Sequence, residues 1–484
     1  MYGRIILVII MKKDYLKKYN YLIFSIIILF IVHMPILLKN LLSADILLNN
    51  GFYNGYSWEV SLGRFGLYAL GLFKAFLSIK ELEFFISIIL IGIIIYILIS
   101  LFEIENTISK VLTSIIICVH PVISATLLFH YCSVGYLLAF LCGILAFYYY
   151  LKKDKIIIPI ILIIISLSMY QAYLSVIVTV FILYQIKLLL DNKIDYKKSL
   201  KYLLVIISGL LLYFVLMKLS LLVLNIPSSS YSGANKVGLS LIGNLPRRIG
   251  ESYSLFYSFY FGNSIMKNTY IHNNIINLIF FGLLFIRLLS NLFNSKSSNK
   301  DKIITIILII LLPVFLNSII FVIAEAKMQL LMSSSYLLLF VLFFSLKESN
   351  KSYIFVLIIF GLLIHNYIIQ DNCTYISLEK TFNKHNTIIN TGVLKYLENP
   401  NYSFAIVGKY KNKKDYYSKM NYGFISDMGL FWDEYNLRKL GLERYISNYY
   451  NLDIKYVSEE EYKSIPISDE YVYIYNDIIV LNIK

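Results

Sequence analysis

The chain has 484 residues, of which 58% are hydrophobic and only 15% charged, and its mean hydropathy is +0.69. Ordinary soluble domains are about 45–50% apolar and roughly 25% charged. The composition therefore excludes a water-soluble enzyme of this size and an intrinsically disordered chain, and it indicates an integral membrane protein. The formal charge of +15 is informative only once the basic residues are assigned to one side of a bilayer.

Apolar runs of the length of a membrane span recur through the first three quarters of the chain. A transmembrane helix needs roughly 20 predominantly apolar residues. About eleven runs qualify: Tyr21–Leu38, Phe84–Phe102, Val111–Phe129, Tyr131–Leu151, Ile156–Tyr173, Leu174–Leu190, Tyr202–Leu224, Ile275–Phe293, Ile303–Ile323, Leu330–Leu346 and Tyr353–Ile369. The sequence predicts an α-helical polytopic membrane protein whose transmembrane core, with about 11 helices, occupies residues 1–370.

The basic residues indicate how this core is oriented. Lysine and arginine near span ends are retained in the cytoplasm. If the N-terminus is inside, the inner segments carry 20 of these residues and the outer loops only 9. We therefore predict a cytoplasmic N-terminus, two large outer loops at 39–83 and 225–274, and an extracytoplasmic tail at 371–484.

The tail is polar and mixed in pattern, unlike the core. Ser377–Leu397 is typical of a helix and Phe404–Gly408 of a short strand. Tyr471–Tyr475 and Ile478–Ile483 flank Asn476-Asp477, which is typical of a β-hairpin. We expect a small α/β domain on the outer surface.

Polar side chains within the membrane are informative because each costs about 2.5–3.5 kcal/mol to insert. In the predicted orientation they gather at the outer ends of the spans: His33, Asp45, His130, Tyr170, Gln171, Glu325, Lys327, Gln329, His365 and Asn366. A functional site is therefore expected at the outer boundary between membrane and water.

The first outer loop contains the groups that a sugar-phosphate site needs. Asp45 and Glu59 offer carboxylates that can act as a general base, and Arg64 can bind phosphate through paired hydrogen bonds. Trp58 provides an aromatic surface for a sugar ring. The structural alternative is a solvated loop with an interfacial tryptophan and an arginine whose charged end extends to the headgroups.

The chain has an acidic residue soon after the first span, the pattern W-x-x-S-L-G-R and a later S-x-Y-Q. In these features it resembles the type II Gtr (GtrII-like) glucosyltransferases, membrane enzymes of bacterial and phage O-antigen modification. The matching residues are Asp45, Trp58–Arg64 and Ser168-Met169-Tyr170-Gln171. The family often has a pair of carboxylates at the first acidic site. Here Ile46 follows Asp45, which leaves open whether Asp45 works alone or shares its role with Glu59.

The resemblance implies a GT-C-type enzyme in the bacterial cytoplasmic membrane, with its active site on the non-cytoplasmic face. It implies a polyprenyl-phosphate sugar as donor, typically of glucose, and a cell-surface polysaccharide as acceptor, either O-antigen or a cell-wall polymer. A small membrane protein that flips the donor is a candidate partner, and no nucleic acid is expected. We predict no cofactor, because no nucleotide-binding glycine loop is seen, and we leave the need for a divalent cation open.

We expect a direct displacement in which Asp45, or secondarily Glu59, acts as the base. The candidate ligands of the donor phosphate are Arg64, Arg247, Arg248 and Lys327, and those of the sugar or acceptor are Trp58, Tyr170 and Gln171. Structural alternatives exist for two of these groups. Tyr170 and Gln171 could join helices, and the segment of Arg247 and Arg248 could be interfacial. The six histidines show no metal-binding spacing, so no metal site is predicted.

Two other classes of protein compete with the enzyme. A polysaccharide or lipid transporter would be expected to show inverted repeats and paired broken helices, which the sequence lacks. A non-catalytic membrane scaffold, with a tail that binds wall polymers or a partner, would leave the residues between Asp45 and Arg64 without an explanation.

Overall fold

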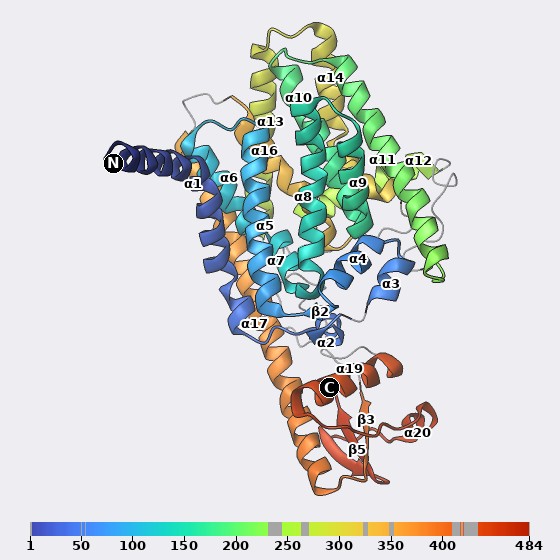
Figure 1. Cartoon of the computed structure of the whole chain (residues 1–484). Helices are drawn as coiled ribbons and strands as arrows, with labels where there is room; N and C mark the ends of the chain where they lie inside the picture. The colour runs from blue at the N-terminus through green and yellow to red at the C-terminus, as the bar shows by residue number, and fades with distance from the viewer. Residues whose placement is uncertain are drawn as a thin grey trace.

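In the computed structural model, helices form a bundle, and a smaller unit that contains a β-sheet lies at one end of it (Figure 1). The structure describes residues 2–49, 51–53, 55–230, 244–262, 271–322, 328–347, 353–408, 417, 420 and 434–483.

Seven helical segments of the described chain are long and apolar enough to cross a membrane. These segments are all or part of the following helices: α1 (Tyr2–Leu38), α5 (Lys80–Leu101), α8 (His130–Lys153), η1 (Gln171–Tyr173) with α10 (Leu174–Leu190), α11 (Tyr196–Val223), α13 (Ile271–Asn294) and α17 (Tyr353–Glu398). An eighth span is possible if α6 (Thr107–Cys118) and α7 (Pro121–Leu128), which are bent by 43° relative to each other, form one span. The chain is thus a mostly helical membrane protein.

The remaining apolar runs are divided among shorter elements. These are α9 (Ile157–Met169), α14 (Asn299–Ile310), α15 (Leu312–Leu316), η4 (Ser318–Phe321), η5 (Leu330–Met332), η6 (Ser334–Leu337) and α16 (Leu338–Ser345). α16 is buried almost throughout, so its hydrophobicity reflects protein packing as much as contact with lipid. The described chain therefore has fewer full-length spans than the eleven apolar runs predict.

The loop at 39–83, predicted to be the first outer loop, folds at the lower end of the bundle in Figure 1. Its elements are α2 (Ala44–Leu48), β1 (Gly51–Phe52), α3 (Tyr56–Ser61), α4 (Phe65–Phe73) and β2 (Leu77–Ser78). β1 and β2 pair antiparallel, which closes the loop before α5 begins. The second predicted outer loop, at 225–274, contributes α12 (Leu245–Tyr260), which packs against α15 and η4.

The C-terminal unit is built on the end of α17. Its other elements are β3 (Ser403–Val407), α19 (Tyr435–Tyr450), α20 (Glu459–Ser464), β4 (Val472–Tyr475) and β5 (Ile478–Asn482). The strand order is β3-β5-β4, with β3 parallel and β4 antiparallel to β5. Asn476 and Asp477 have φ angles of 45° and 61°, as a two-residue type I′ turn requires. The predicted strand and hairpin are confirmed.

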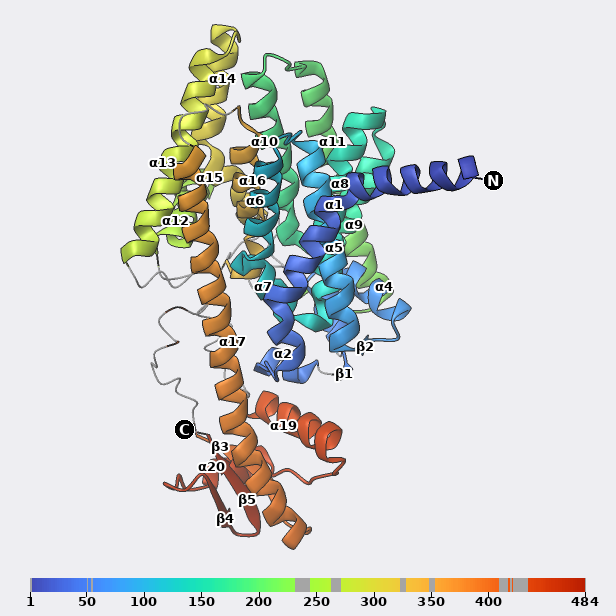
Figure 2. The same ribbon diagram turned by 90° about the vertical axis from the view of Figure 1, so that its left-hand side faces the viewer.

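The predicted helix at Ser377–Leu397 is the lower part of α17, which continues without interruption from the membrane bundle (Figure 2). The boundary drawn after residue 370 therefore falls inside a helix.

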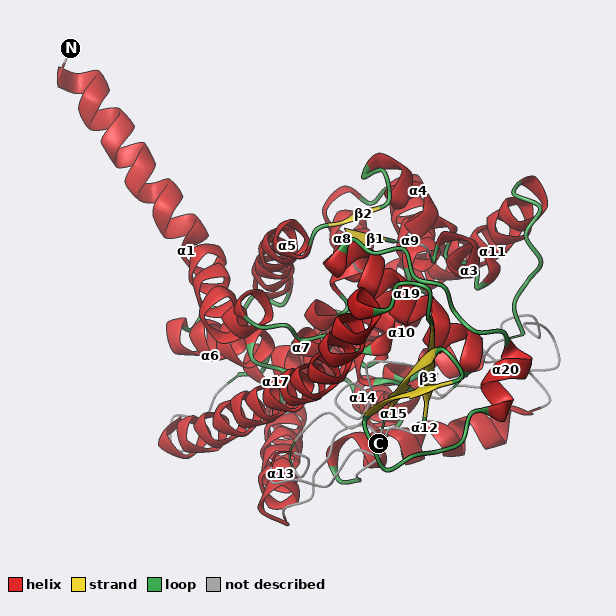
Figure 3. Cartoon of the chain, turned by 90° about the horizontal axis from the view of Figure 1, so that it is seen from below, coloured by secondary structure: helices red, strands yellow, loops and turns green. Residues whose placement is uncertain are grey.

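α2 lies at the end of the bundle and also packs against α19 of the C-terminal unit. Leu47 is buried in the same apolar cluster as Leu442 and Ile446 of α19, and the Arg444 guanidinium donates a hydrogen bond to the Leu48 carbonyl. Seen from below, α19 and the sheet extend across the lower end of the bundle (Figure 3). The C-terminal unit thereby fixes the position of the short helix that carries Asp45.

Candidate active site

The turn at Gly63, in the W-x-x-S-L-G-R motif, contacts the later S-x-Y-Q motif through Gln171. The φ of +85° at Gly63 is a left-handed conformation that favours glycine. In this turn the Leu62 carbonyl accepts a hydrogen bond from Gln171 Nε2 (2.5 Å), and the Gly63 carbonyl accepts one from Tyr213 Oη (3.1 Å). A Cβ at Gly63 would lie 2.5 Å from Met217 Sδ. Backbone conformation and close packing therefore both require glycine in S-L-G-R.

A second close approach sets α4 directly against the end of α9. A Cβ at Gly66 would lie 2.4 Å from Ser168 Oγ and 2.9 Å from the Ser168 carbonyl carbon. Ser168 opens the S-x-Y-Q motif, so this contact brings Tyr170 and Gln171 beside the residue that follows Gly63. Tyr170 itself is extended, with φ −158°, and it separates α9 from η1.

Arg64 is the centre of the resulting network. Its Nη1 donates hydrogen bonds to Glu59 Oε2 (2.9 Å) and Tyr136 Oη (3.3 Å). Its Nε donates to Gln171 Oε1 (3.3 Å). The guanidinium carbon lies 4.8 Å from the centre of the Tyr170 ring, which stacks on Tyr136 with 4.2 Å between ring centres. These contacts hold a cation in one orientation.

The second terminal nitrogen of Arg64 differs from the other two nitrogens of the guanidinium in its partners. Within the described residues Nη2 has no hydrogen-bond partner, and 19% of the side chain is exposed. A guanidinium that is oriented on one edge and open on the other is suited to bind a phosphate oxygen.

The two carboxylates of the site have different environments. Glu59 is buried and forms an ion pair with Arg64. Asp45 is partly buried on α2, and its carboxylate has no hydrogen bond or ion pair with a residue that the structure describes. Burial, with a smaller contribution from the negative charge of Glu59, raises the pKa of Asp45 to about 6. A carboxylate with this pKa is mostly ionised at neutral pH and accepts a proton readily, as a general base must.

Of the other predicted ligands, Trp58 lies on α3 and its side chain is about half exposed. Arg247 and Arg248 lie on α12, where both form ion pairs with Glu251. These pairs join the arginines to their own helix, and their role in phosphate binding stays a prediction. Lys327 lies outside the described residues.

The sequence motifs did not reveal three tyrosines that complete the site. Tyr136 and Tyr213 contact Arg64 and Gln171 directly. The Tyr53 ring lies 5.3 Å from that of Tyr131, and burial together with the charge of Glu59 raises the pKa of Tyr53 far above its usual range. With 43 tyrosines in the chain, residue type alone could not single these out.

Within the described ranges, no group of three His, Cys, Asp or Glu side chains is placed to hold a metal ion. Arg64 and Glu59 form an ion pair at the site, and the negative charge of Glu59 acts on Asp45.

The bundle has several helices long and apolar enough to cross a membrane, and at one end of it an oriented arginine is paired with a buried acid, which defines a polytopic membrane protein with a polar site at one end of its helices. The family described as Glucosyl transferase GtrII matches residues 34–346, a range that includes Asp45, Arg64 and Gln171. The chain belongs to this family and is therefore a glycosyltransferase, which uses a sugar donor and a glycan acceptor. No curated protein and no solved structure gives a significant match.

Proposed function

We propose that the protein transfers a glucosyl or related hexosyl group from a polyprenyl-phosphate sugar to a cell-surface polysaccharide, on the outer face of the bacterial cytoplasmic membrane. A separate membrane protein would bring the donor to that face. The observation that carries the proposal is the carboxylate of Asp45, which has a raised pKa and no partner among the described residues. It accompanies an arginine with one nitrogen open in the same part of the chain.

The proposed reaction is a direct displacement. Asp45 removes the proton from an acceptor hydroxyl, and the oxygen attacks the anomeric carbon of the donor. The bond between that carbon and the phosphate oxygen breaks, and polyprenyl phosphate leaves with the bonding electrons. Arg64 Nη2 stabilises the charge on the leaving phosphate, and Glu59 holds Arg64 in place. Base and cation are thus positioned before the substrate arrives, as efficient charge stabilisation requires.

The distribution of lysines supports an outward-facing site. The lysine-containing turns 154–156, 191–195 and 295–298 join helices at the upper end of the bundle, whereas α2, α3 and α4 lie at the lower end (Figure 1). Because basic loops are retained in the cytoplasm, the lower end with Asp45 and Arg64 would face outward.

The surroundings of the site support a lipid-linked donor. α11 contributes Tyr213 to the polar network, and the same part of the helix exposes Leu212, Val215 and Leu219. Exposed apolar side chains on a membrane helix contact lipid, so a donor held by an isoprenoid chain would approach Arg64 along α11. A phosphate at headgroup depth would then meet the Arg64 guanidinium.

Purified protein in proteoliposomes tests this proposal with two donors, glucosyl polyprenyl phosphate and UDP-glucose, and with envelope polysaccharide from the source cells as the acceptor. We expect transfer from the lipid-linked donor alone, and loss of transfer in Asp45→Asn. A second variant, Asp45→Cys, reports the orientation through its reaction with a membrane-impermeant thiol reagent. Efficient use of UDP-glucose, or labelling of Asp45→Cys only from the cytoplasmic side, would overturn the proposal.

A further inference from the structure

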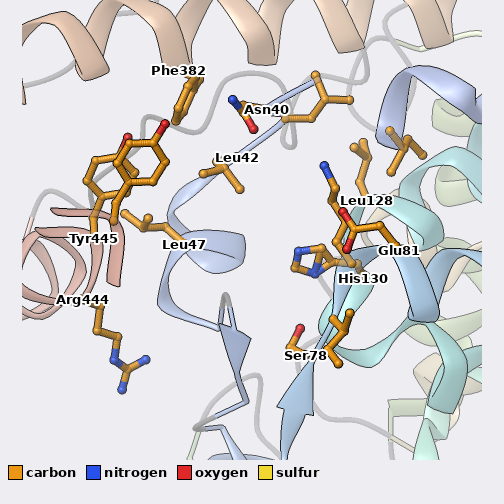
Figure 4. Close-up of a pocket in the computed structure, with 15 residues that line it drawn as sticks. Asn40, Leu42, Leu47, Ser78, Glu81, Leu128, His130, Phe382, Arg444 and Tyr445 are labelled. Atoms are coloured by element: carbon orange, nitrogen blue, oxygen red, sulfur yellow. The ribbon is translucent and has the colours of Figure 1, made fainter. Parts of the chain in front are cut away.

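A cavity of about 390 Å³ lies between the C-terminal unit and the end of the bundle (Figure 4). Its volume is in the range of small-ligand pockets, roughly 300–1,000 Å³. The lining residues come from α1, from the loop before α2, from α2 itself, from the β2–α5 junction, and from α7, α8, α17 and α19. Asp45 and Arg64 are not among them, so the cavity is separate from the proposed catalytic site.

One side of the cavity presents polar groups that lack partners. His130 is 4% exposed, and neither of its ring nitrogens has a hydrogen-bond partner among the described residues. Ser78 is 3% exposed, and its hydroxyl is also without a partner there. Figure 4 shows both side chains on the same side of the cavity. Buried polar groups are costly to leave unpaired, so a ligand that reached these side chains would supply the missing hydrogen bonds.

The chemistry of these groups matches hydroxyls. A neutral imidazole offers one donor and one acceptor, and a serine hydroxyl can act as either. Sugar hydroxyls likewise donate and accept, so one ring with two free hydroxyls could satisfy both side chains.

The opposite side of the cavity is aromatic. The rings of Tyr445 and Tyr449 on α19 stack at 5.2 Å with an angle of 8° between their planes, and Tyr449 is 62% exposed. Phe382 of α17 lies next to Tyr445 (Figure 4). Flat aromatic surfaces of this kind cover the apolar face of a sugar ring.

The cations at the cavity are already engaged. Lys80 Nζ donates hydrogen bonds to the Leu37 carbonyl (3.1 Å) and the Lys39 carbonyl (3.4 Å), and Arg444 donates to the Leu48 carbonyl. Glu81 adds a negative charge to the lining. The cavity therefore favours a neutral, hydroxyl-rich ligand over a phosphate group.

α2 separates the cavity from the catalytic carboxylate. Leu47 lines the cavity, and Asp45 precedes it by two residues. With about 3.6 residues per helical turn, these two side chains project from nearly opposite faces of the helix. A single glycan chain that passes around α2 could therefore reach both places.

We propose that this cavity is an acceptor subsite, which holds a non-reacting sugar unit of the glycan while a neighbouring unit presents its hydroxyl to Asp45. The inference rests on the proposed function for the identity of the glycan as acceptor. The cavity and its lining by His130, Ser78 and the paired tyrosines do not depend on that function.

The test uses the full-length protein in nanodiscs without donor, and a fluorescently labelled oligosaccharide fraction released from the envelope polysaccharide of the source cells. Tyr449→Ala removes an exposed ring of the cavity wall. Tyr471→Ala is the matched control, because Tyr471 is 52% exposed in the same C-terminal unit but does not line the cavity. Ser78→Ala removes one buried hydroxyl without adding bulk.

We expect Tyr449→Ala to weaken oligosaccharide binding about five- to tenfold, which is the order of one well-placed aromatic contact, and Ser78→Ala to weaken it less. Tyr471→Ala should bind like the wild type. In transfer assays Tyr449→Ala should raise KM for the acceptor, while kcat and KM for the donor stay unchanged.

The inference is overturned if the wild type does not bind the oligosaccharides, if Tyr449→Ala behaves like Tyr471→Ala, or if KM for the donor rises instead. Failure of the proposed donor gives a different result. In that case the oligosaccharides bind and Tyr449→Ala weakens their binding, but no transfer from glucosyl polyprenyl phosphate occurs.

Discussion

Replacing Asp45 by Asn should have opposite effects on stability and on activity. The pKa of Asp45 is about 6 in the folded protein, against an ordinary value of 3.8. One pKa unit corresponds to about 1.36 kcal/mol, so holding this carboxylate ionised costs the folded state up to about 3 kcal/mol. Asn has nearly the same shape and no charge. At pH 7.5 the variant should therefore be more stable than the wild type, by an amount of this order.

The sign of the pH dependence follows from linkage. Because the folded protein binds the Asp45 proton more tightly than the unfolded chain, protonation stabilises the fold. This contribution is fully present below pH 4 and is lost as the pH rises through about 6. The stability gain of Asp45→Asn should accordingly disappear at low pH. Transfer by the wild type should change in the other direction and fall as the pH drops below about 6, since a protonated Asp45 cannot act as a base.

Thermal unfolding in detergent at several pH values, together with transfer assays in membranes, measures both effects. Loss of a general base typically costs about 10²–10⁴-fold in rate. Asp453→Asn is the matched control, because Asp453 is an exposed aspartate of the C-terminal unit, and it should change neither property. Wild-type transfer by Asp45→Asn, or a stability difference that does not depend on pH, would refute the reasoning.

Three further changes test the neighbouring groups. Arg64→Lys keeps the charge but loses the fork that reaches Glu59 and Gln171, so transfer should fall about 10²-fold; a rate near that of the wild type would show that charge alone is sufficient. Gly63→Ala places a Cβ 2.5 Å from Met217 Sδ in a left-handed turn, and it should lower the free energy of unfolding by about 1–3 kcal/mol. Thermal melting measures this effect, and Gly250→Ala is the control because its Cβ would meet no atom within 4 Å. Because Arg64 already supplies a cation, treatment with a chelator should leave the transfer rate unchanged, and a loss of activity that Mg²⁺ or Mn²⁺ restores would contradict this.

Features set by local chemistry could be predicted from the sequence. The hairpin of β4 and β5 follows from two short runs of β-branched and aromatic residues on either side of Asn476-Asp477, two residue types that tolerate positive φ. The long apolar helices follow from composition in the same way. The number of full-length spans could be predicted less well from the sequence. An apolar run has the same composition whether its helix is continuous or interrupted by one extended residue, as at Tyr170.

The candidate site was predictable only as a set of residues. The motifs identified Arg64, Glu59, Tyr170 and Gln171, which the structure brings into contact. The different environments of Asp45 and Glu59 could not be read from their spacing, because they depend on which carboxylate meets Arg64 after folding. The cavity could not be predicted either, because its lining combines the start of α8 with α19, two segments that are far apart in the sequence.

The length of α17 has a consequence for which polymers the enzyme can meet. Its 46 residues extend for about 69 Å at 1.5 Å per residue, more than twice the roughly 30 Å hydrocarbon thickness of a bilayer. An unbroken helix has no hinge, so with its upper part in the bilayer α17 would hold the terminal sheet at a constant distance from the membrane surface. Glycan chains that reach the height of the terminal sheet would be glycosylated. Glycan chains that lie flat on the headgroups, or that extend far beyond this height, would not be glycosylated.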